Sequence, residues 1–189
     1  LRRLRIPASV AVGLYPHLRA VDVRLTATAP SRRVAQRLLA QVEVPLRRAL
    51  GVTLYGTDDA TLEEVVGAWL VRRHKTLAVA ESCTGGLVSD RLTDVPGSSR
   101  YLRGSLLAYH NDLKRGCLRV PARTLTRFGA VSEQTAKAMA IGVRELAGAD
   151  LGLSITGIAG PTGGTPKKPV GLVCFGLADR RHALNSVIA

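Results

Sequence analysis

Long apolar segments and paired cysteines are both missing from the 189-residue chain. No run of about 18 or more apolar residues occurs, and the arginine-rich start lacks the apolar core and small-residue cleavage site of a signal peptide. The cysteines, Cys83, Cys117 and Cys174, form no C-x-x-C pair, which argues against both a disulfide framework and a zinc site. We therefore expect a soluble cytoplasmic protein with no membrane partner.

Acidic residues are also few, since 14 Asp and Glu stand against 27 Lys and Arg and the formal net charge is +13. The excess is spread along the whole chain instead of forming a basic arm, so general solubility explains it as well as a nucleic-acid-binding stripe does. A nucleic-acid-binding protein stays an alternative that the pattern does not favour. Only five of the basic residues are Lys, so a Lys inside a motif is informative.

Residues 1–59 are predicted to form a small α+β unit. Val21–Ala27 alternates apolar and polar residues, as a half-buried strand does. The next segment has helical spacing of its apolar residues and ends at Gly51, and Pro45 is expected to kink or divide this helix. Residues 52–55 have the pattern of a short strand.

Residues 60–189 alternate strand and helix patterns, which predicts an α/β sandwich. The chain begins without Met and ends in a strand-like segment, so we expect the first unit to be incomplete and the second to lack its last element. The expected helices are 62–73, 87–93 and one that is capped by Ser132 and ended by Gly148, and the expected strands are 76–80, 101–109, 151–156 and 170–178.

Ser82 is the first candidate for chemistry, because the segment AESCTGG at residues 80–86 joins a strand pattern to a helix pattern. Such a corner exposes a hydroxyl beside backbone N–H groups that favour an anion or an oxyanion. A catalytic serine or a phosphate-binding loop fits, and so does a plain turn capped by Ser82 or Thr84. Cys83 is a rival nucleophile on the same turn.

A nucleophilic serine needs a base, and two candidates fall in residues 109–114. His110 has no obvious carboxylate partner. Lys114 can accept the serine proton if burial lowers its pKa, which an arginine cannot do, and Tyr109 could relay or orient that proton. The alternative for Lys114 is a solvated charge at a helix start.

The glycine-rich segment 157–164 is the third candidate, because its N–H groups could cradle a phosphate with help from threonine hydroxyls. It matches neither the Walker A motif nor the dinucleotide fingerprint. The adjacent Lys167 and Lys168 either guide an anion or are merely solvated. All three candidate segments follow predicted strands, so we expect them to share one crevice.

As a set, these motifs resemble the CinA C-terminal domain family, which includes nicotinamide mononucleotide amidases. The resemblance covers about residues 60–189, while residues 1–59 resemble the small KH-like domain of longer CinA proteins. Those proteins usually carry a further N-terminal domain associated with ADP-ribose pyrophosphatase activity. The motifs that carry the resemblance are AESCTGG at 80–86, VPGSS at 95–99, Y-x-N-x-x-K at 109–114, GAVSE at 129–133, and TGIAGP through KPVG at 156–171.

The resemblance implies an amidohydrolase that converts nicotinamide mononucleotide to nicotinate mononucleotide and ammonia with no metal or cofactor. Ser82 would be the nucleophile, Lys114 the base and Tyr109 an assisting residue. The alternative is a catalytically silent nucleotide-binding or assembly module. The expected substrate-binding residues are Thr84, Gly85, Gly86, Asn111, Thr156, Gly157, Gly160, Thr162 and Gly163.

Two positions depart from the family pattern, since Thr162 replaces a usual glycine and Asp112 a common Glu. Residues 1–60 contain no Gly-x-x-Gly clamp, which argues against RNA binding by the KH-like unit. The resemblance also implies a homodimer.

Overall fold

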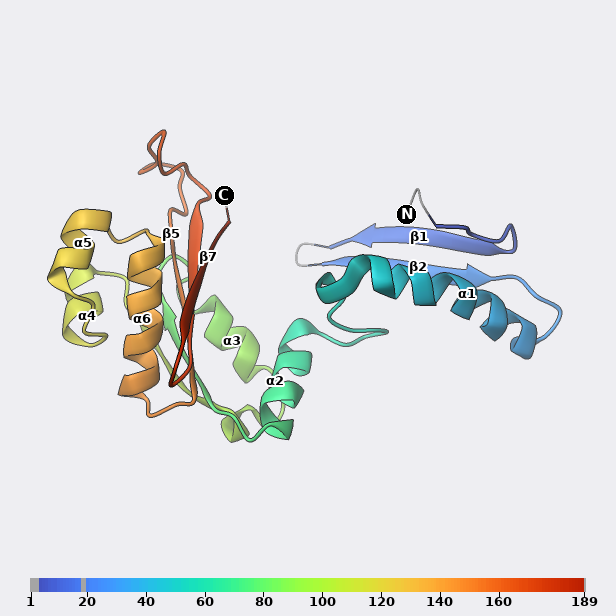
Figure 1. Ribbon diagram of the computed structural model, residues 1–189, viewed down its shortest axis with the longest axis horizontal. Coiled ribbons are helices and arrows are strands. Elements are labelled where there is room, and N and C mark those ends of the chain that lie inside the picture. The colour runs from blue at the N-terminus through green and yellow to red at the C-terminus, as the bar shows by residue number, and fades with distance from the viewer. Residues whose placement is uncertain (1–3, 18–19, 189) are drawn as a thin grey trace. The chain divides into compact units, whose positions relative to one another are not determined.

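The computed structural model describes residues 4–17 and 20–188, which divide into a unit ending at Thr57 and a second unit starting at Asp58 (Figure 1). In the first unit, strands β1 (Val10–Pro16) and β2 (Val21–Ala27) pair antiparallel, and helix α1 (Arg32–Leu50) follows. Val42 and Leu46 of α1 are buried. Strand β2 lies where the alternation predicts it, whereas β1 was not predicted.

The first unit differs from the sequence predictions in two further places. Pro45 does not divide α1, because it removes a single hydrogen bond while Val42 and Leu46 on either side stay buried. The strand predicted at 52–55 is wrong, since Gly51–Thr53 is a short 3-10 helix, η1. Val52 is fully exposed, so its β-branched side chain has no sheet to pack against.

The second unit is built on a five-stranded sheet in the order β4-β3-β5-β6-β7 (Figure 1). Strand β3 pairs in parallel with β4 and with β5, whereas β6 and β7 continue the sheet antiparallel. The strands are β3 (Leu77–Glu81), β4 (Leu102–Leu107), β5 (Leu151–Gly157), β6 (Val173–Ala178) and β7 (Ala183–Ile188). The helices are α2 (Leu62–Arg72), α3 (Leu87–Thr93), η2 (Ser98–Arg100), α4 (Asn111–Gly116), α5 (Ala122–Phe128) and α6 (Glu133–Leu146).

Both faces of β3 are covered, so all five of its residues are buried. Ala78 and Ala80 belong to a cluster with Met139 of α6, and Val79 belongs to a second cluster with Leu70 of α2. This is the α/β sandwich predicted from the sequence, with a small α+β unit before it. Helices α4 and α5 were not predicted, because six or seven residues carry too little of a helical pattern. In the part of the chain that the structure describes, no helix is both long and apolar enough to cross a membrane.

Helix α6 approaches the sheet so closely that two strands carry glycine beneath it. A Cβ atom added at Gly152 would lie 2.1 Å from the carbonyl oxygen of Ala140, and one added at Gly176 would lie 2.4 Å from that of Ala136. Both oxygens belong to the helix backbone, which cannot move aside as a side chain can.

We predict that Gly176→Ala lowers the free energy of unfolding by about 1–3 kcal/mol, because the added methyl forces α6 away from β6. Denaturant unfolding measures this change. Gly116→Ala is the matched control, since no atom lies within 4 Å of a Cβ added there. Equal stability of the two variants would contradict the close approach.

Candidate active site

Ser82 follows the last residue of β3 and is nearly buried, with 7% of its surface exposed. Its backbone N–H donates to the carbonyl of Ile155 in β5 at 3.0 Å. The chain then turns through Gly85 and Gly86, whose φ angles of 62° and 104° lie in the left-handed region that glycine adopts without strain. Helix α3 begins directly after this turn, so Ser82 is fixed at the carboxyl edge of the parallel strands.

Lys114 reaches this edge from α4 and is the residue that contacts Ser82. Its side chain is 1% exposed, and its Nζ lies 3.0 Å from Ser82 Oγ. The same Nζ donates to the carbonyl oxygens of Ala108 at 2.7 Å and Tyr109 at 2.8 Å. The alternative of a solvated charge for Lys114 is therefore wrong.

These three contacts surround the Lys114 Nζ with oxygen atoms of uncharged groups. As an ammonium group, Nζ donates to all three oxygens. Once it is deprotonated, it keeps its two hydrogens for the carbonyl oxygens of Ala108 and Tyr109, which only accept, and its lone pair can face the hydroxyl of Ser82. Burial lowers the pKa of Lys114 below its ordinary value of 10.5, with a smaller opposite effect from Cys83. Among the described residues, no carboxylate forms an ion pair with Lys114 that would restore its charge. The geometry can thus pass the Ser82 proton to Lys114.

Glu81, one residue before Ser82, is buried as a carboxylate inside a set of donors. It accepts from the N–H of Val88 at 3.0 Å, from the N–H of Ser89 at 2.8 Å and from the Ser89 hydroxyl. Burial by itself raises the pKa of Glu81, but the hydrogen bonds from Ser89 and Val88 outweigh it and hold the pKa below 4.5. Glu81 therefore ties the end of β3 to the start of α3.

This arrangement corrects the sequence-based picture of free N–H groups at the helix start. The first N–H groups of α3 already donate to Glu81 and to the turn, so they are closed to an anion. The N–H of Gly85 donates to the Ser82 carbonyl at 3.3 Å. In the described part of the chain, the N–H groups of Thr84 and Gly86, like that of Cys83, donate to no carbonyl, which leaves them for a ligand.

The other predicted residues divide into exposed and packed ones. Tyr109 contributes its carbonyl to Lys114, but the residue is 74% exposed and, among the described residues, its phenol makes no hydrogen bond. Asn111 is exposed at the start of α4. Thr156 is buried and donates to the carbonyl of Ala130 at 2.9 Å, so its hydroxyl is engaged within the protein.

The two rival reactive residues are placed differently from Ser82 and Lys114. Cys83 packs against Gly157, where an added Cβ would lie 2.9 Å from its sulfur, and burial raises the pKa of the thiol. His110 is exposed and caps α4, because its Nδ1 accepts from the N–H of Asp112 at 3.3 Å. These positions favour neither Cys83 as the nucleophile nor His110 as the base.

The glycine-rich loop starts at Gly157, beside Cys83, and leads from β5 to β6 at the same edge. Gly160 is half-buried, and Thr162 and Gly163 are exposed. Sequence reasoning missed the two carbonyls that hold Lys114 and the role of Glu81. Main-chain carbonyls have no sequence signature, although a charged residue inside an otherwise apolar strand is a signal that could have singled out Glu81.

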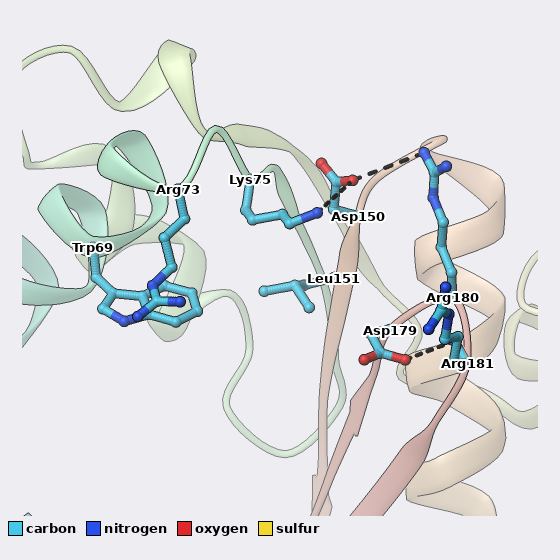
Figure 2. A pocket seen from close by; sticks show the side chains of 8 residues that line it. All are labelled: Trp69, Arg73, Lys75, Asp150, Leu151, Asp179, Arg180 and Arg181. Atoms are coloured by element: carbon cyan, nitrogen blue, oxygen red, sulfur yellow. Dashed lines mark hydrogen bonds and ion pairs between the residues drawn. The ribbon is translucent and has the colours of Figure 1, made fainter.

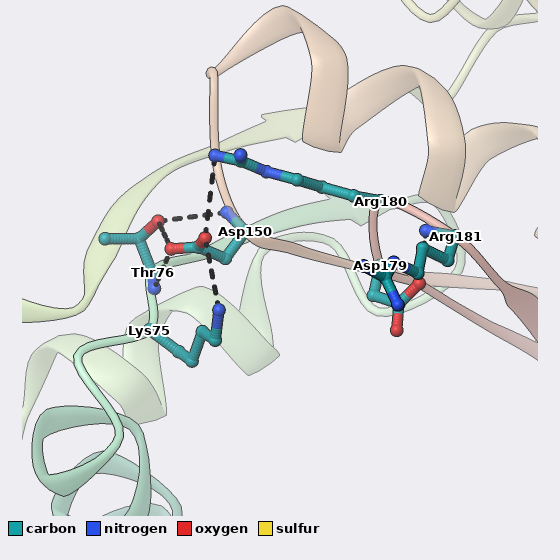
Figure 3. Close-up of polar contacts among 6 residues, drawn as sticks. All are labelled: Lys75, Thr76, Asp150, Asp179, Arg180 and Arg181. Carbon is teal, nitrogen blue, oxygen red and sulfur yellow. Dashed lines mark hydrogen bonds and ion pairs between the residues drawn. The ribbon is translucent and has the colours of Figure 1, made fainter.

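A cavity of about 460 Å³ lies at the opposite, amino end of the sheet (Figure 2). Arg73 stacks on the Trp69 ring there, 4.7 Å from its centre. Asp150 accepts from the N–H and hydroxyl of Thr76 and lies within 3.8 Å of Lys75 and Arg180 (Figure 3). Asp150 is thus paired with two of the cations that line the cavity, and the cavity is separate from Ser82. It is lined by Trp69, Arg73, Lys75, Asp150, Leu151, Asp179, Arg180 and Arg181.

The fold and the site together define an α/β domain with a buried serine–lysine pair at the carboxyl edge of its sheet. The chain belongs to the CinA family, because residues 59–188 match the CinA C-terminal domain and residues 5–56 match the damage-inducible protein CinA KH domain.

Relatives with known sequences include a competence-damage inducible protein of Desulforudis audaxviator, 52% identical over 87% of this chain and 40% of that protein. A CinA-like protein of Desulfotalea psychrophila is 48% identical over 90% of this chain and 41% of its own length. The chain therefore spans about two fifths of the relatives that it matches.

Solved structures show the same fold. The crystal structure of a competence/damage inducible protein from Agrobacterium tumefaciens is 40% identical, with a TM-score of 0.64 over 66% of this chain and 76% of that one. A CinA superfamily protein from Escherichia coli is 29% identical, with a TM-score of 0.64 over 74% of this chain and 84% of that one.

We predict that Glu81→Gln makes the protein less stable at pH 7 by about 1–3 kcal/mol, because the amide places N–H groups against the donors of Val88 and Ser89. The folded-state pKa of Glu81 lies below 4.5, so its stabilisation is complete above that value and is lost as the pH falls through the folded-state pKa. Unfolding measured from pH 7 down to pH 3 should show this loss in the wild type and a smaller loss in Glu81→Gln.

Glu145→Gln provides the control, since Glu145 lies exposed on α6 beside Arg144. If Glu145→Gln reduces the acid dependence of unfolding as much as Glu81→Gln does, the stabilising role assigned to Glu81 is wrong.

Proposed function

We propose that this chain is the amidase part of a nicotinamide-nucleotide amidase, which hydrolyses nicotinamide mononucleotide to nicotinate mononucleotide and ammonia. The observation that carries the proposal is the 3.0 Å contact between Ser82 Oγ and a buried Lys114 Nζ whose other partners are two carbonyls. An amine of lowered pKa beside a serine hydroxyl is suited to acyl transfer. Membership of the CinA family supports the amide of a pyridine nucleotide as substrate.

In the first half of the reaction, Ser82 Oγ attacks the carboxamide carbon while its proton moves to Lys114 Nζ. The carbonyl oxygen becomes an oxyanion, which the free N–H groups of Thr84 and Gly86 stabilise. The carbon–nitrogen bond then breaks, and Lys114 returns the proton to the departing nitrogen, which leaves as ammonia. A nicotinoyl ester on Ser82 remains.

In the second half, water attacks that ester and gives a proton to Lys114, and nicotinate mononucleotide leaves as Ser82 regains its proton. The glycine-rich loop after β5 binds the nucleotide phosphate through its backbone N–H groups. Tyr109 holds Lys114 through its carbonyl, and its exposed phenol lies on the surface that substrate approaches.

The first kinetic prediction concerns the nucleophile. Ser82→Ala should reduce ammonia release from nicotinamide mononucleotide by about a thousandfold or more while nucleotide binding persists, because the covalent step is lost. Cys83→Ala should keep most activity, since the Cys83 sulfur packs against Gly157 and it is Ser82 whose hydroxyl contacts Lys114 Nζ. The reversed result would assign the nucleophile to Cys83, and binding without any ammonia release by the wild type would favour the silent module.

The second kinetic prediction concerns the base. Lys114→Arg keeps a positive charge but cannot release a proton near neutral pH, so activity should fall by about a thousandfold. In the wild type, kcat/KM should rise with pH through the folded-state pKa of Lys114, which lies below 10.5 because the side chain is buried. An acidic limb that disappears in His110→Ala, with Lys114→Arg still active, would assign the base to His110.

A further inference from the structure

The connection between α5 and α6 has an unusual pattern of hydrogen bonds. Each of the four successive carbonyl oxygens at residues 128–131 accepts from a side chain that comes from another part of the domain or from the start of α6. Such donors replace the partners that a helix or strand would supply. The donors are Lys168 Nζ to Phe128 and Val131, Ser132 and Thr135 hydroxyls to Gly129, and the Thr156 hydroxyl to Ala130.

Lys168 makes the contacts of longest range in this set. Its Nζ donates to the carbonyl of Phe128 at 2.6 Å and to that of Val131 at 2.6 Å, which lie 40 and 37 residues away in the sequence. The side chain is half-buried, and its ammonium group also lies where a Cβ on Gly129 would approach it to 3.3 Å. Neighbouring Lys167, by contrast, is exposed.

Ordering the loop that carries Lys168 costs much conformational entropy. Glycines at 160, 163, 164 and 171 give it wide conformational freedom, and it projects beyond the end of the sheet as the orange-red segment between β5 and β6 (Figure 1). At its base, Ile158 pairs with Leu172 and Gly171 through backbone hydrogen bonds of 2.9 and 2.8 Å.

Further out, the loop is closed by a small turn at Lys168. The N–H of Thr165 donates to the Lys168 carbonyl at 2.7 Å, and the N–H of Lys168 donates to the Thr165 carbonyl at 3.0 Å. The Lys168 side chain then fastens this turn to residues 128–131. The Lys168 ammonium group therefore fixes the outer part of the loop to the rest of the domain.

We propose that Lys168 is a positioning residue that clamps the glycine-rich loop to the α5–α6 connection and so holds the loop in its binding-competent form at the edge that carries Ser82. Its role for ligand binding rests on the proposed amidase function, while the clamp itself does not. If the loop is ordered only part of the time, the apparent affinity for the ligand falls in proportion to the fraction of molecules in which the loop is ordered. Loss of order in the loop leaves the contact between Ser82 and Lys114 unchanged.

The test compares Lys168→Met with Lys167→Met. Both remove one charge from adjacent positions, but only the first removes the donors to Phe128 and Val131. Hydrogen exchange of the purified 189-residue chain should be about tenfold faster at Thr165 and Gly171 in Lys168→Met, because their hydrogen bonds open more often. Exchange in β3 should stay at its wild-type rate, which separates loop opening from global unfolding.

The kinetic arm measures ammonia release from nicotinamide mononucleotide. Lys168→Met should raise KM about tenfold with kcat within about twofold of the wild type, and Lys168→Arg, which can still donate to a carbonyl, should recover part of the loss. Lys167→Met should match the wild type in both arms.

The two arms separate this inference from the proposed function. Faster loop exchange in Lys168→Met, in a protein that releases no ammonia in any form, would support the clamp and reject the amidase. Wild-type loop exchange in Lys168→Met, or equal effects of Lys167→Met, would overturn the clamp whether or not the protein is an amidase. A fall in kcat at unchanged KM would also overturn the positioning role.

Discussion

The parallel pairing of β3 with β4 on one side and β5 on the other is the constraint on which the site depends. Three strands that run the same way must end at the same edge, so the segments after them converge although they lie far apart in the sequence. Ser82 follows β3, the carbonyls that hold Lys114 follow β4, and the glycine-rich loop follows β5. Covering both faces of this sheet also draws α6 close enough to require glycine in β5 and β6.

Two buried ionisable groups flank the same corner and meet opposite surroundings. Glu81 accepts from main-chain and hydroxyl donors, which keep it charged despite its burial. Burial lowers the pKa of Lys114, because its hydrogen-bond partners are oxygens of neutral groups, which supply no compensating charge. The carboxylate can therefore act as a fixed support for the turn, while the amine is free to exchange a proton. The difference lies in the partners, since both side chains are about equally buried.

The connection at residues 128–131 joins further parts of the site through hydrogen bonds to its main-chain carbonyls. It starts at Phe128, the last residue of α5, and continues outside both helices, so its carbonyls are open to side chains from β5, from α6 and from the loop before β6. The bonds donated by Thr156 and Lys168 each join residues that lie more than twenty positions apart in the sequence. Polar contacts of this kind hold together parts of the site that the apolar core does not reach.

Local patterns in the sequence were sufficient for much of the fold and for Ser82. Strand β2, helix α3 and the Ser132 cap of α6 follow from alternation, helical spacing and a capping side chain, which act over a few residues. Only the tertiary structure decided that β1 forms, that α1 continues through a proline, and that Lys114 meets Ser82 at 3.0 Å. Those outcomes depend on burial and on main-chain carbonyls brought together by strand pairing, and neither leaves a mark in the spacing of residues along the chain.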